Sequence, residues 1–331
     1  MNTVCFWIRN ARVKALPQSL LPAALALCMA SRRENFSVWL GIIAVLGVIA
    51  GHLCMNLFDD YFDYRVKGAE FRDVLAKKGF RSRIAKCSYL TSGQADLKQL
   101  LMACLTFGAI SLGTGFVIFL FRGNPILWFA LAAAILGVSY SGGPLRLSYR
   151  GLGEMLIGVV FGPLLMSGVY YAACGQLDWT VALVSVPVGL LVANIVYVHA
   201  IMDYEPDREA GKMTLAVLLK SKRRMLAVLF LLLLAAFGCI AGGVATGCLP
   251  PFYLFTFLAL PMAAGLFCLM IEFVRHPEKK FSPQVWMGPM SDWKRIQSLH
   301  LDWFMIRWLP ARNLLSFFCL IIIAVTLCRA G

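Results

Sequence analysis

Charge is scarce in this sequence. Only 15% of its 331 residues are Asp, Glu, Lys or Arg, whereas 60% are apolar. A soluble domain would have about 25% charged residues, so this shortage argues against an ordinary soluble protein. Apolar stretches long enough to cross a hydrocarbon core of about 30 Å recur along the whole chain. The composition therefore predicts an all-α, polytopic membrane protein that forms a single domain over residues 1–331.

Paired cysteine motifs are absent. The eleven cysteines are scattered singly, with no C-x-x-C pair and no histidine at ligand spacing. This pattern argues against a thiolate metal site and against a disulfide framework. Most of these cysteines fall inside apolar stretches, where Cys behaves as a small apolar residue. We expect them to have a packing role.

Nine apolar stretches are candidate transmembrane helices, and we expect them to surround a central cavity. The first is short, contains Pro17 and Pro22, and follows Arg9, Arg12 and Lys14 as the apolar part of a signal peptide would. Eight later stretches make a cleaved leader unnecessary, so we expect the first to stay as a helix. The predicted spans are 16–31, 37–58, 98–121, 125–141, 152–173, 180–202, 225–247, 251–274 and 312–329.

Basic residues are nearly absent from one side of the predicted membrane. With nine spans, all but four of the 31 Lys and Arg fall on segments that share a side with the N-terminus; the exceptions are Arg32, Arg33, Arg122 and Arg329. The positive-inside rule then predicts a protein integral to the cytoplasmic (inner) membrane, with its N-terminus and cavity opening on the cytoplasmic side. The net charge of +14 reflects this asymmetry and anionic substrates, and we expect no nucleic-acid partner.

Acidic residues gather in two windows. Nine of the 17 Asp and Glu lie within 59–73 or 203–209, which open the predicted acidic loops 59–97 and 203–224. In each window a polar residue precedes an aspartate by four positions, and a second aspartate follows three or four positions later. Each window follows an even-numbered span. This similarity predicts a pseudo-repeat of four-helix halves, with both windows on one side of the membrane.

The two windows present Asp60 with Asp63 and Asp203 with Asp207. Each pair shares one face if its segment is helical. Because neighbouring carboxylates raise one another's pKa, a positive partner should hold them ionised. Mg²⁺ prefers oxygen ligands and is usually shared with a substrate phosphate, so a diphosphate joined to an apolar tail fits this cavity. The interleaved basic residues are Lys67, Arg72, Arg208 and Lys212. The alternative is that these carboxylates only meet water at helix ends.

Two motifs taken together resemble those of the UbiA-type intramembrane prenyltransferases. They are N-x-x-D-D-x-x-D after the second span and D-x-x-x-D-R-E-A-G-K-x-T-L-A after the sixth. The resemblance covers roughly residues 9–274. Within the family, four further motifs are most similar to those of the 1,4-dihydroxy-2-naphthoate polyprenyltransferases: W7-I-R-N-A-R, Y140-S-G-G-P, Y149-R-G-L-G-E154 and F161-G-P. This resemblance implies a nine-span fold and one shared active site.

The resemblance also implies roles for individual residues. The four paired aspartates match the family's metal ligands, and Tyr140 matches a cavity residue whose ring could stabilise a carbocation. The further implied metal ligands are Asp59, which replaces an Asn, and Glu70, which is shifted by one position. The implied substrate-binding residues are Asn56, Lys67, Ser141, Arg146, His199, Arg208 and Lys212. H199-A-I-M202 departs from the family's Asn-Asn-x-Arg, so Arg208 or Lys212 would replace the missing Arg.

The activity implied by the resemblance is Mg²⁺-dependent transfer of a polyprenyl group from polyprenyl diphosphate to 1,4-dihydroxy-2-naphthoate, in contact with membrane lipid. The same residues leave other acceptors open, namely 4-hydroxybenzoate, homogentisate, a haem or a glycerophosphate. A cation-coupled transporter is the alternative from another class, because parallel repeats and acidic residues also occur there.

Several polar residues have a structural interpretation as well. His199 and His52 are interpreted as lining residues, with a direct functional role as the alternative. Glu154 would either orient Arg146 or face the headgroups, and G142-G143-P144 is typical of a tight turn. Pro206 predicts a break at the end of the sixth span. Segment 275–311 is typical of an amphipathic interfacial helix, with a lid over the cavity as the alternative.

Overall fold

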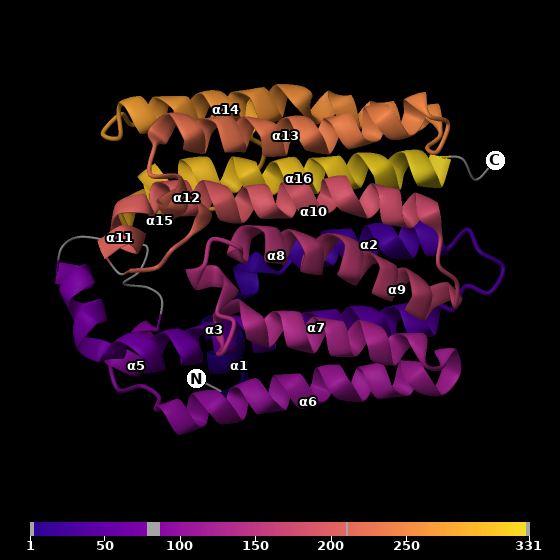
Figure 1. The fold of residues 1–331 in the computed structure, drawn as a ribbon, viewed down its shortest axis with the longest axis horizontal. Coiled ribbons are helices and arrows are strands. Elements are labelled where there is room, and N and C mark those ends of the chain that lie inside the picture. The colour runs from indigo at the N-terminus through magenta and orange to yellow at the C-terminus, as the bar shows by residue number, and fades with distance from the viewer. Residues whose placement is uncertain (1–2, 78–86, 210, 329–331) are drawn as a thin grey trace.

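The computed structural model describes residues 3–77, 87–209 and 211–328, while the side chains of 66–77 lie outside the description. Within these ranges every regular element is a helix and no strand occurs, which confirms the predicted all-α fold. The long helices lie side by side and run roughly along one axis (Figure 1).

Within the part of the chain that the structure describes, seven helices are long and apolar enough to cross a membrane. They are the part Val38–Arg65 of α3 (Val38–Lys77), α6 (Leu97–Arg122), α8 to α9 (Gly153–Cys174), α10 (Trp179–Met202), α13 (Lys222–Ala245), η4 to α14 (Pro251–Arg275) and α16 (Asp302–Cys328). The other two predicted spans are apolar helices of 14 and 17 residues, α2 (Pro17–Ala30) and α7 (Pro125–Ser141). The membrane-spanning fold is thus confirmed, but the count of nine spans is not.

The first acidic window lies on a helix rather than in a loop, so the predicted loop 59–97 is wrong in its first part. Helix α3 continues without a break to Lys77. No proline interrupts it, and the aromatic rings of Phe58, Tyr61 and Tyr64 extend its apolar face past the aspartates. These rings pack against a cluster that includes Tyr89 of α5 (Ser88–Thr91).

The second acidic window begins where the sixth predicted span ends, as Pro206 predicted. Helix α10 stops at Met202, and Asp203 is its C-cap. Pro206 has no N–H to donate to the carbonyl four residues earlier, so the chain turns into the short helix α11 (Tyr204–Glu209). A second short helix, α12 (Leu215–Leu219), follows, so 203–224 is not simply a loop.

Segment 275–311 is not one interfacial helix. Prolines at 277, 283 and 289 prevent a continuous helix, and only η5 (Val285–Met287) and α15 (Trp293–Ser298) form before α16 begins at Asp302. The segment is held to the bundle by Met287, Met290 and Ile296, which pack against residues of α14 (Leu260–Arg275) and α16.

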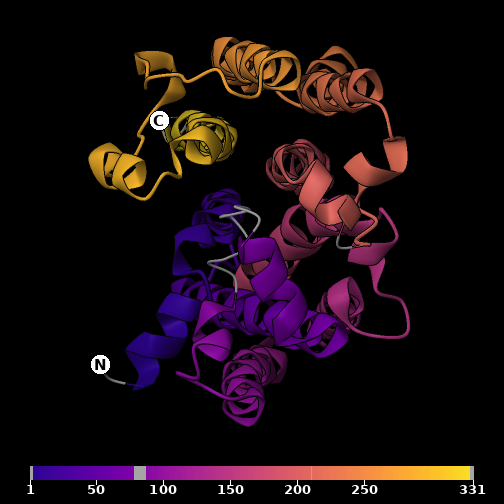
Figure 2. The ribbon, with the colours of Figure 1, turned by 90° about the vertical axis from the view of Figure 1, so that its left-hand side faces the viewer.

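Both acidic windows lie at the same end of the bundle. Helices α5 and α11, which adjoin them, are found together at the left of Figure 1. Viewed from that end, elements of the first part of the chain lie below and those of the last part lie above (Figure 2). This placement agrees with the prediction that the windows share a side; the pseudo-repeat itself stays a prediction.

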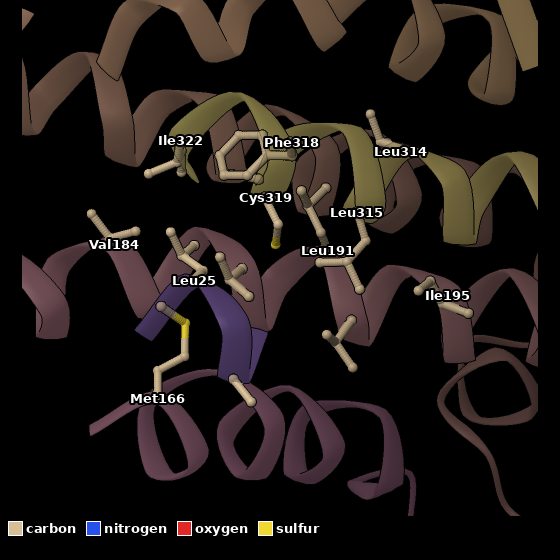
Figure 3. Packing of buried hydrophobic residues seen from close by; sticks show 14 of the residues in the cluster. Leu25, Met166, Val184, Leu191, Ile195, Leu314, Leu315, Phe318, Cys319 and Ile322 are labelled. Carbon is tan, nitrogen blue, oxygen red and sulfur yellow. The ribbon is translucent and has the colours of Figure 1, made fainter. Parts of the chain in front are cut away.

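The main core forms around α10. Its most apolar window is 72% buried, against 11% for α6, so α10 is central and α6 faces the surroundings. Leu191 of α10 lies beside Leu315 of α16 in this core, and Ile195 and Phe318 belong to the same cluster (Figure 3). These contacts fix the inner wall on which the second acidic window is placed.

Glycines bring α10 very close to the fifth predicted span. That span is interrupted by a π-helical turn over Val160–Leu164, which contains Pro163. A Cβ added to Gly162 would lie 2.5 Å from the carbonyl oxygen of Ser185 and 2.6 Å from the Cα of Gly189. Both neighbours are backbone atoms, so an added side chain would force the two helices apart.

We therefore expect Gly162→Ala to destabilise the protein by about 1–3 kcal/mol through overpacking. Thermal unfolding of the detergent-solubilised protein measures this as a lower Tm. Gly238→Ala on α13 is the matched control, because its added Cβ would meet nothing within 4 Å. Equal Tm values for the two variants would contradict this account of the helix contact.

Candidate functional site

A cavity of about 1440 Å³ runs between the helices, as the sequence predicted. Its walls come from α3, α6, α7, α8 to α10 and the start of α16. Among the described side chains, five aspartates line it: Asp59, Asp60, Asp63, Asp203 and Asp207. We call the part of the cavity next to them the acidic end. Elsewhere the lining is mostly small or apolar, for example Gly115, Ala133 and Phe129.

Arg12 holds the first acidic window together. It lies between α1 (Thr3–Asn10) and η1 (Val13–Ala15) in a left-handed conformation. Its guanidinium donates to Asp60 Oδ1 at 2.7 Å, to Asp59 Oδ2 at 3.3 Å and to the carbonyl of Asn56 at 2.7 Å. The side-chain amide of Asn56 donates in turn to the carbonyl of Ala11 at 2.9 Å. The N-terminal segment is thereby bonded to α3.

Hydroxyl groups also donate hydrogen bonds to these carboxylates. Tyr89 donates to Asp60 Oδ2 at 3.0 Å, and Ser141 donates to Asp59 Oδ1 at 2.6 Å. Burial by itself lowers the pKa of Arg12, but the charges of Asp60 and Asp59 outweigh it and raise that pKa. Burial and the charge of Asp60 likewise raise the pKa of Tyr89. Arg12 therefore stays charged and Tyr89 stays protonated.

Tyr149 connects the two acidic windows. Its hydroxyl donates to Asp63 Oδ1 at 2.6 Å. The ammonium group of Lys212 lies 5.6 Å from the centre of its ring, in cation–π geometry. The backbone N–H of Lys212 donates to the carbonyl of Asp207 at 2.8 Å. Tyr149 thus lies between a carboxylate of the first window and a cation of the second.

The second window is formed by Asp203 and Asp207, which are both 3% exposed. His199 Nε2 lies 3.1 Å from Asp203 Oδ2, one helical turn away on α10. Glu154 is also buried and lines the cavity, and its Oε1 accepts from the backbone N–H of Leu215 at 3.1 Å. Glu154 therefore orients the start of α12, so both of its predicted roles, orienting Arg146 or facing headgroups, are wrong.

Most predicted site residues meet at the cavity. Those that line it are Asn56, Asp59, Asp60, Asp63, Tyr140, Ser141, His199, Asp203, Asp207 and Lys212. Two predicted cations do not. Arg146 is exposed in the turn that follows α7, and Arg208 is exposed and paired with Glu205 at 2.9 Å. The side chains of Lys67 and Glu70 lie outside the described residues.

Three residues that donate hydrogen bonds to the aspartates of the first acidic window were not predicted as site residues: Arg12, Tyr89 and Tyr149. Arg12 was noted as a basic residue before an apolar stretch and as the last residue of the quoted motif W7-I-R-N-A-R, but no role in the site was assigned to it. Tyr149 belongs to a quoted motif, Y149-R-G-L-G-E154, but its contact with Asp63 joins residues 86 positions apart. No local pattern marks Tyr89, because only the fold brings α5 to Asp60.

Among the side chains that the structure describes, no three His, Cys, Asp or Glu come close enough together to hold a metal ion by themselves. A preformed metal site made of protein groups alone is therefore not confirmed. The acidic end instead offers carboxylate oxygens on two walls of one cavity, with Arg12 bonded to Asp60 on the first wall and Lys212 over the ring of Tyr149 near the second.

Comparisons with known proteins agree with this architecture. A model of the UbiA prenyltransferase family matches residues 19–287. A 1,4-dihydroxy-2-naphthoate octaprenyltransferase from Haemophilus influenzae is 30% identical over 78% of this chain and 83% of its own length. An enzyme of the same name from Mycobacterium tuberculosis is 28% identical over 74% of this chain and 84% of its own length.

Solved structures show the same fold. A digeranylgeranylglyceryl phosphate synthase is 15% identical with a TM-score of 0.61, over 99% of this chain and 100% of the other. A UbiA homologue from Archaeoglobus fulgidus, bound to GPP and Mg²⁺, is 18% identical with a TM-score of 0.60, over 96% of this chain and 99% of the other.

We expect Arg12→Gln to destabilise the protein by about 1–3 kcal/mol, because Asp60 would lose a charged hydrogen-bond donor. Thermal unfolding without divalent cations measures the loss. Adding Mg²⁺ should restore part of it, since an ion that binds only the folded state raises the Tm. Arg9→Gln is the control, because exposed Arg9 has no carboxylate partner among the described side chains. Equal Tm values for both variants would contradict the role given to Arg12.

Proposed function

Because this chain belongs to the UbiA prenyltransferase family, we propose that it transfers a polyprenyl group from polyprenyl diphosphate to 1,4-dihydroxy-2-naphthoate. The observation that supports this proposal best is the joining of two acidic windows at one end of a single large cavity with apolar walls. A diphosphate joined to a long apolar tail matches both parts of that cavity. The relatives named above suggest the aromatic acceptor.

The acidic end suits a divalent cation bound together with its substrate. Carboxylates are the oxygen donors that Mg²⁺ prefers, and Mg²⁺ usually shares its ligands with water and substrate phosphates. A site in which the protein supplies only some of the metal ligands is consistent with this way of binding Mg²⁺. Asp60, Asp63, Asp203 and Asp207 would hold the ion, with Asp59 beside them. When bound, Mg²⁺ neutralises the charge that develops on a departing diphosphate.

The chain's own cations would act on the same leaving group. Lys212 lines the cavity next to Asp207, and Arg12 lines it next to Asp60, so both can donate to phosphate oxygens. They take the place of Arg146 and Arg208, which the fold directs elsewhere. Donors fixed in place before the reaction stabilise the developing charge without reorganising.

The cavity also protects the electrophile. Loss of diphosphate leaves an allylic cation at the end of the prenyl group. Tyr140 lines the cavity, and its ring face would stabilise that cation. The apolar lining keeps out water, which would otherwise capture it. The aromatic ring of the acceptor then forms the new carbon–carbon bond, and its carboxylate leaves as carbon dioxide.

The chain is an integral membrane protein by its long apolar helices and its family. We further propose that the acidic end faces the cytoplasm. The support for this orientation is the charge asymmetry, since the side that carries the acidic windows also carries most of the Lys and Arg.

Asp60→Asn and Asp203→Asn should each lower transfer to 1,4-dihydroxy-2-naphthoate at least about 100-fold, because each removes a carboxylate charge that would hold the Mg²⁺ beside the departing diphosphate. Purified protein, an all-trans polyprenyl diphosphate and Mg²⁺ are combined, and the prenylated product is quantified by chromatography. 4-Hydroxybenzoate and homogentisate are assayed alongside as alternative acceptors.

Asp96→Asn is the matched control for charge. Asp96 caps α6 by accepting from Gln99 N at 2.7 Å, a role that Asn also fills, and it does not line the cavity. Full activity in both site variants would contradict the proposed site. Turnover of another acceptor, with none of the dihydroxynaphthoate, would contradict the proposed substrate.

A further inference from the structure

His52 is a buried histidine that the proposed chemistry has not used. It lies on α3, is 6% exposed, and lines the cavity. Its ring packs edge-on against Phe161, 5.0 Å away between centres. A buried imidazole in an apolar wall needs hydrogen-bond partners for its nitrogens, because an unsatisfied polar group costs about 1–3 kcal/mol.

Ser19 determines which nitrogen of His52 carries the proton. The Ser19 hydroxyl lies 3.0 Å from the carbonyl of Leu16 and 2.7 Å from His52 Nδ1. A hydroxyl has one proton, and a carbonyl can only accept. Both contacts are hydrogen bonds only if Ser19 donates to Leu16 and His52 Nδ1–H donates to Ser19. The neutral ring then has an unprotonated Nε2, which is an acceptor.

No hydrogen bond to Nε2 is formed by the described residues, although His52 lines the cavity. His52 Nε2 can therefore accept a hydrogen bond from a ligand bound in the cavity. The protein supplies a ring whose tautomer and orientation are already fixed at Nδ1, which is the usual way a histidine is prepared for one task.

The position of His52 suits the acceptor rather than the diphosphate. Residues 52, 56 and 60 share one face of α3, and His52 lies eight residues, or about 12 Å of helix rise, from Asp60. Between them, the amide of Asn56 already donates to Ala11. His52 is thus a polar group on this face that lies farther from the acidic end than Asp60 and Asn56, where the rest of the cavity lining is mostly apolar.

We propose that His52 Nε2 accepts a hydrogen bond from a ring hydroxyl of the aromatic acceptor, and that Ser19 is the positioning residue that fixes its tautomer. This inference rests on the proposed function and adds the group that selects a hydroxylated ring. A hydroxyl that donates a hydrogen bond gains phenolate character. The ring carbons that attack the allylic cation therefore become more electron-rich.

Steady-state kinetics of the purified, full-length protein test this assignment. His52→Leu should lower kcat/KM for the dihydroxynaphthoate about tenfold, the effect of losing one hydrogen bond of ordinary strength. The KM for polyprenyl diphosphate should stay unchanged. His52→Gln should recover part of the loss, because its amide oxygen also accepts. Ser19→Ala should give a smaller loss, which disappears in the His52→Leu background.

Ser185→Ala is the matched control. Ser185 is fully buried and donates to the carbonyl three residues earlier at 2.7 Å, as Ser19 does, but it does not line the cavity. It should leave both KM values unchanged. Wild-type kinetics in His52→Leu, or an equal rise in both KM values, would overturn the inference while the proposed function stands. If the wild-type protein prenylates no aromatic acceptor, the proposed function itself fails.

Discussion

The acidic end depends on one electrostatic constraint: carboxylates buried in an apolar bundle must be matched by positive charge or by donated hydrogen bonds. Asp60 is 1% exposed, and an unmatched charge there would carry a desolvation penalty of several kcal/mol. Arg12 and Tyr89 bond its two oxygens. Because Arg12 comes from the N-terminal segment and Tyr89 from α5, one buried charge fixes three parts of the chain.

The same constraint relates the fold to the proposed chemistry. An uninterrupted α3 presents Asp59, Asp60 and Asp63 on one wall, while the break after Met202 presents Asp203 and Asp207 on another. Tyr149 lies between the walls, bonded to Asp63 and next to Lys212. The site is thus negatively charged but already provided with cations, which suits an anionic ligand that arrives with a metal ion. A purely acidic cleft would repel that ligand.

Much of this could be predicted from the sequence, because it depends on properties that neighbouring residues share. Apolar runs predicted the helices, the two acidic windows predicted the shared cavity, and Pro206 predicted the break after α10. The length of α3 was harder to predict. This helix continues past its aspartates because its aromatic side chains pack against the rest of the fold, and not because its sequence there is apolar enough for a membrane span. The basic residues that reach the acidic end were even harder to predict. Arg146 and Arg208 are close to the motifs in sequence but turn outward, whereas Arg12 reaches Asp60 across 48 positions. Such contacts are set by packing between distant segments, which no local pattern encodes.

The central claim is that the two acidic windows hold one ligand together. A double-mutant cycle on Mg²⁺-dependent binding of geranyl diphosphate, with Asp63→Asn, Asp207→Asn and the double variant, measures their coupling by calorimetry. If both aspartates act on one metal-bound diphosphate, their effects should be non-additive by about 0.5–3 kcal/mol, as for residues in one network. Strict additivity, or unchanged affinity in either single variant, would contradict a shared site.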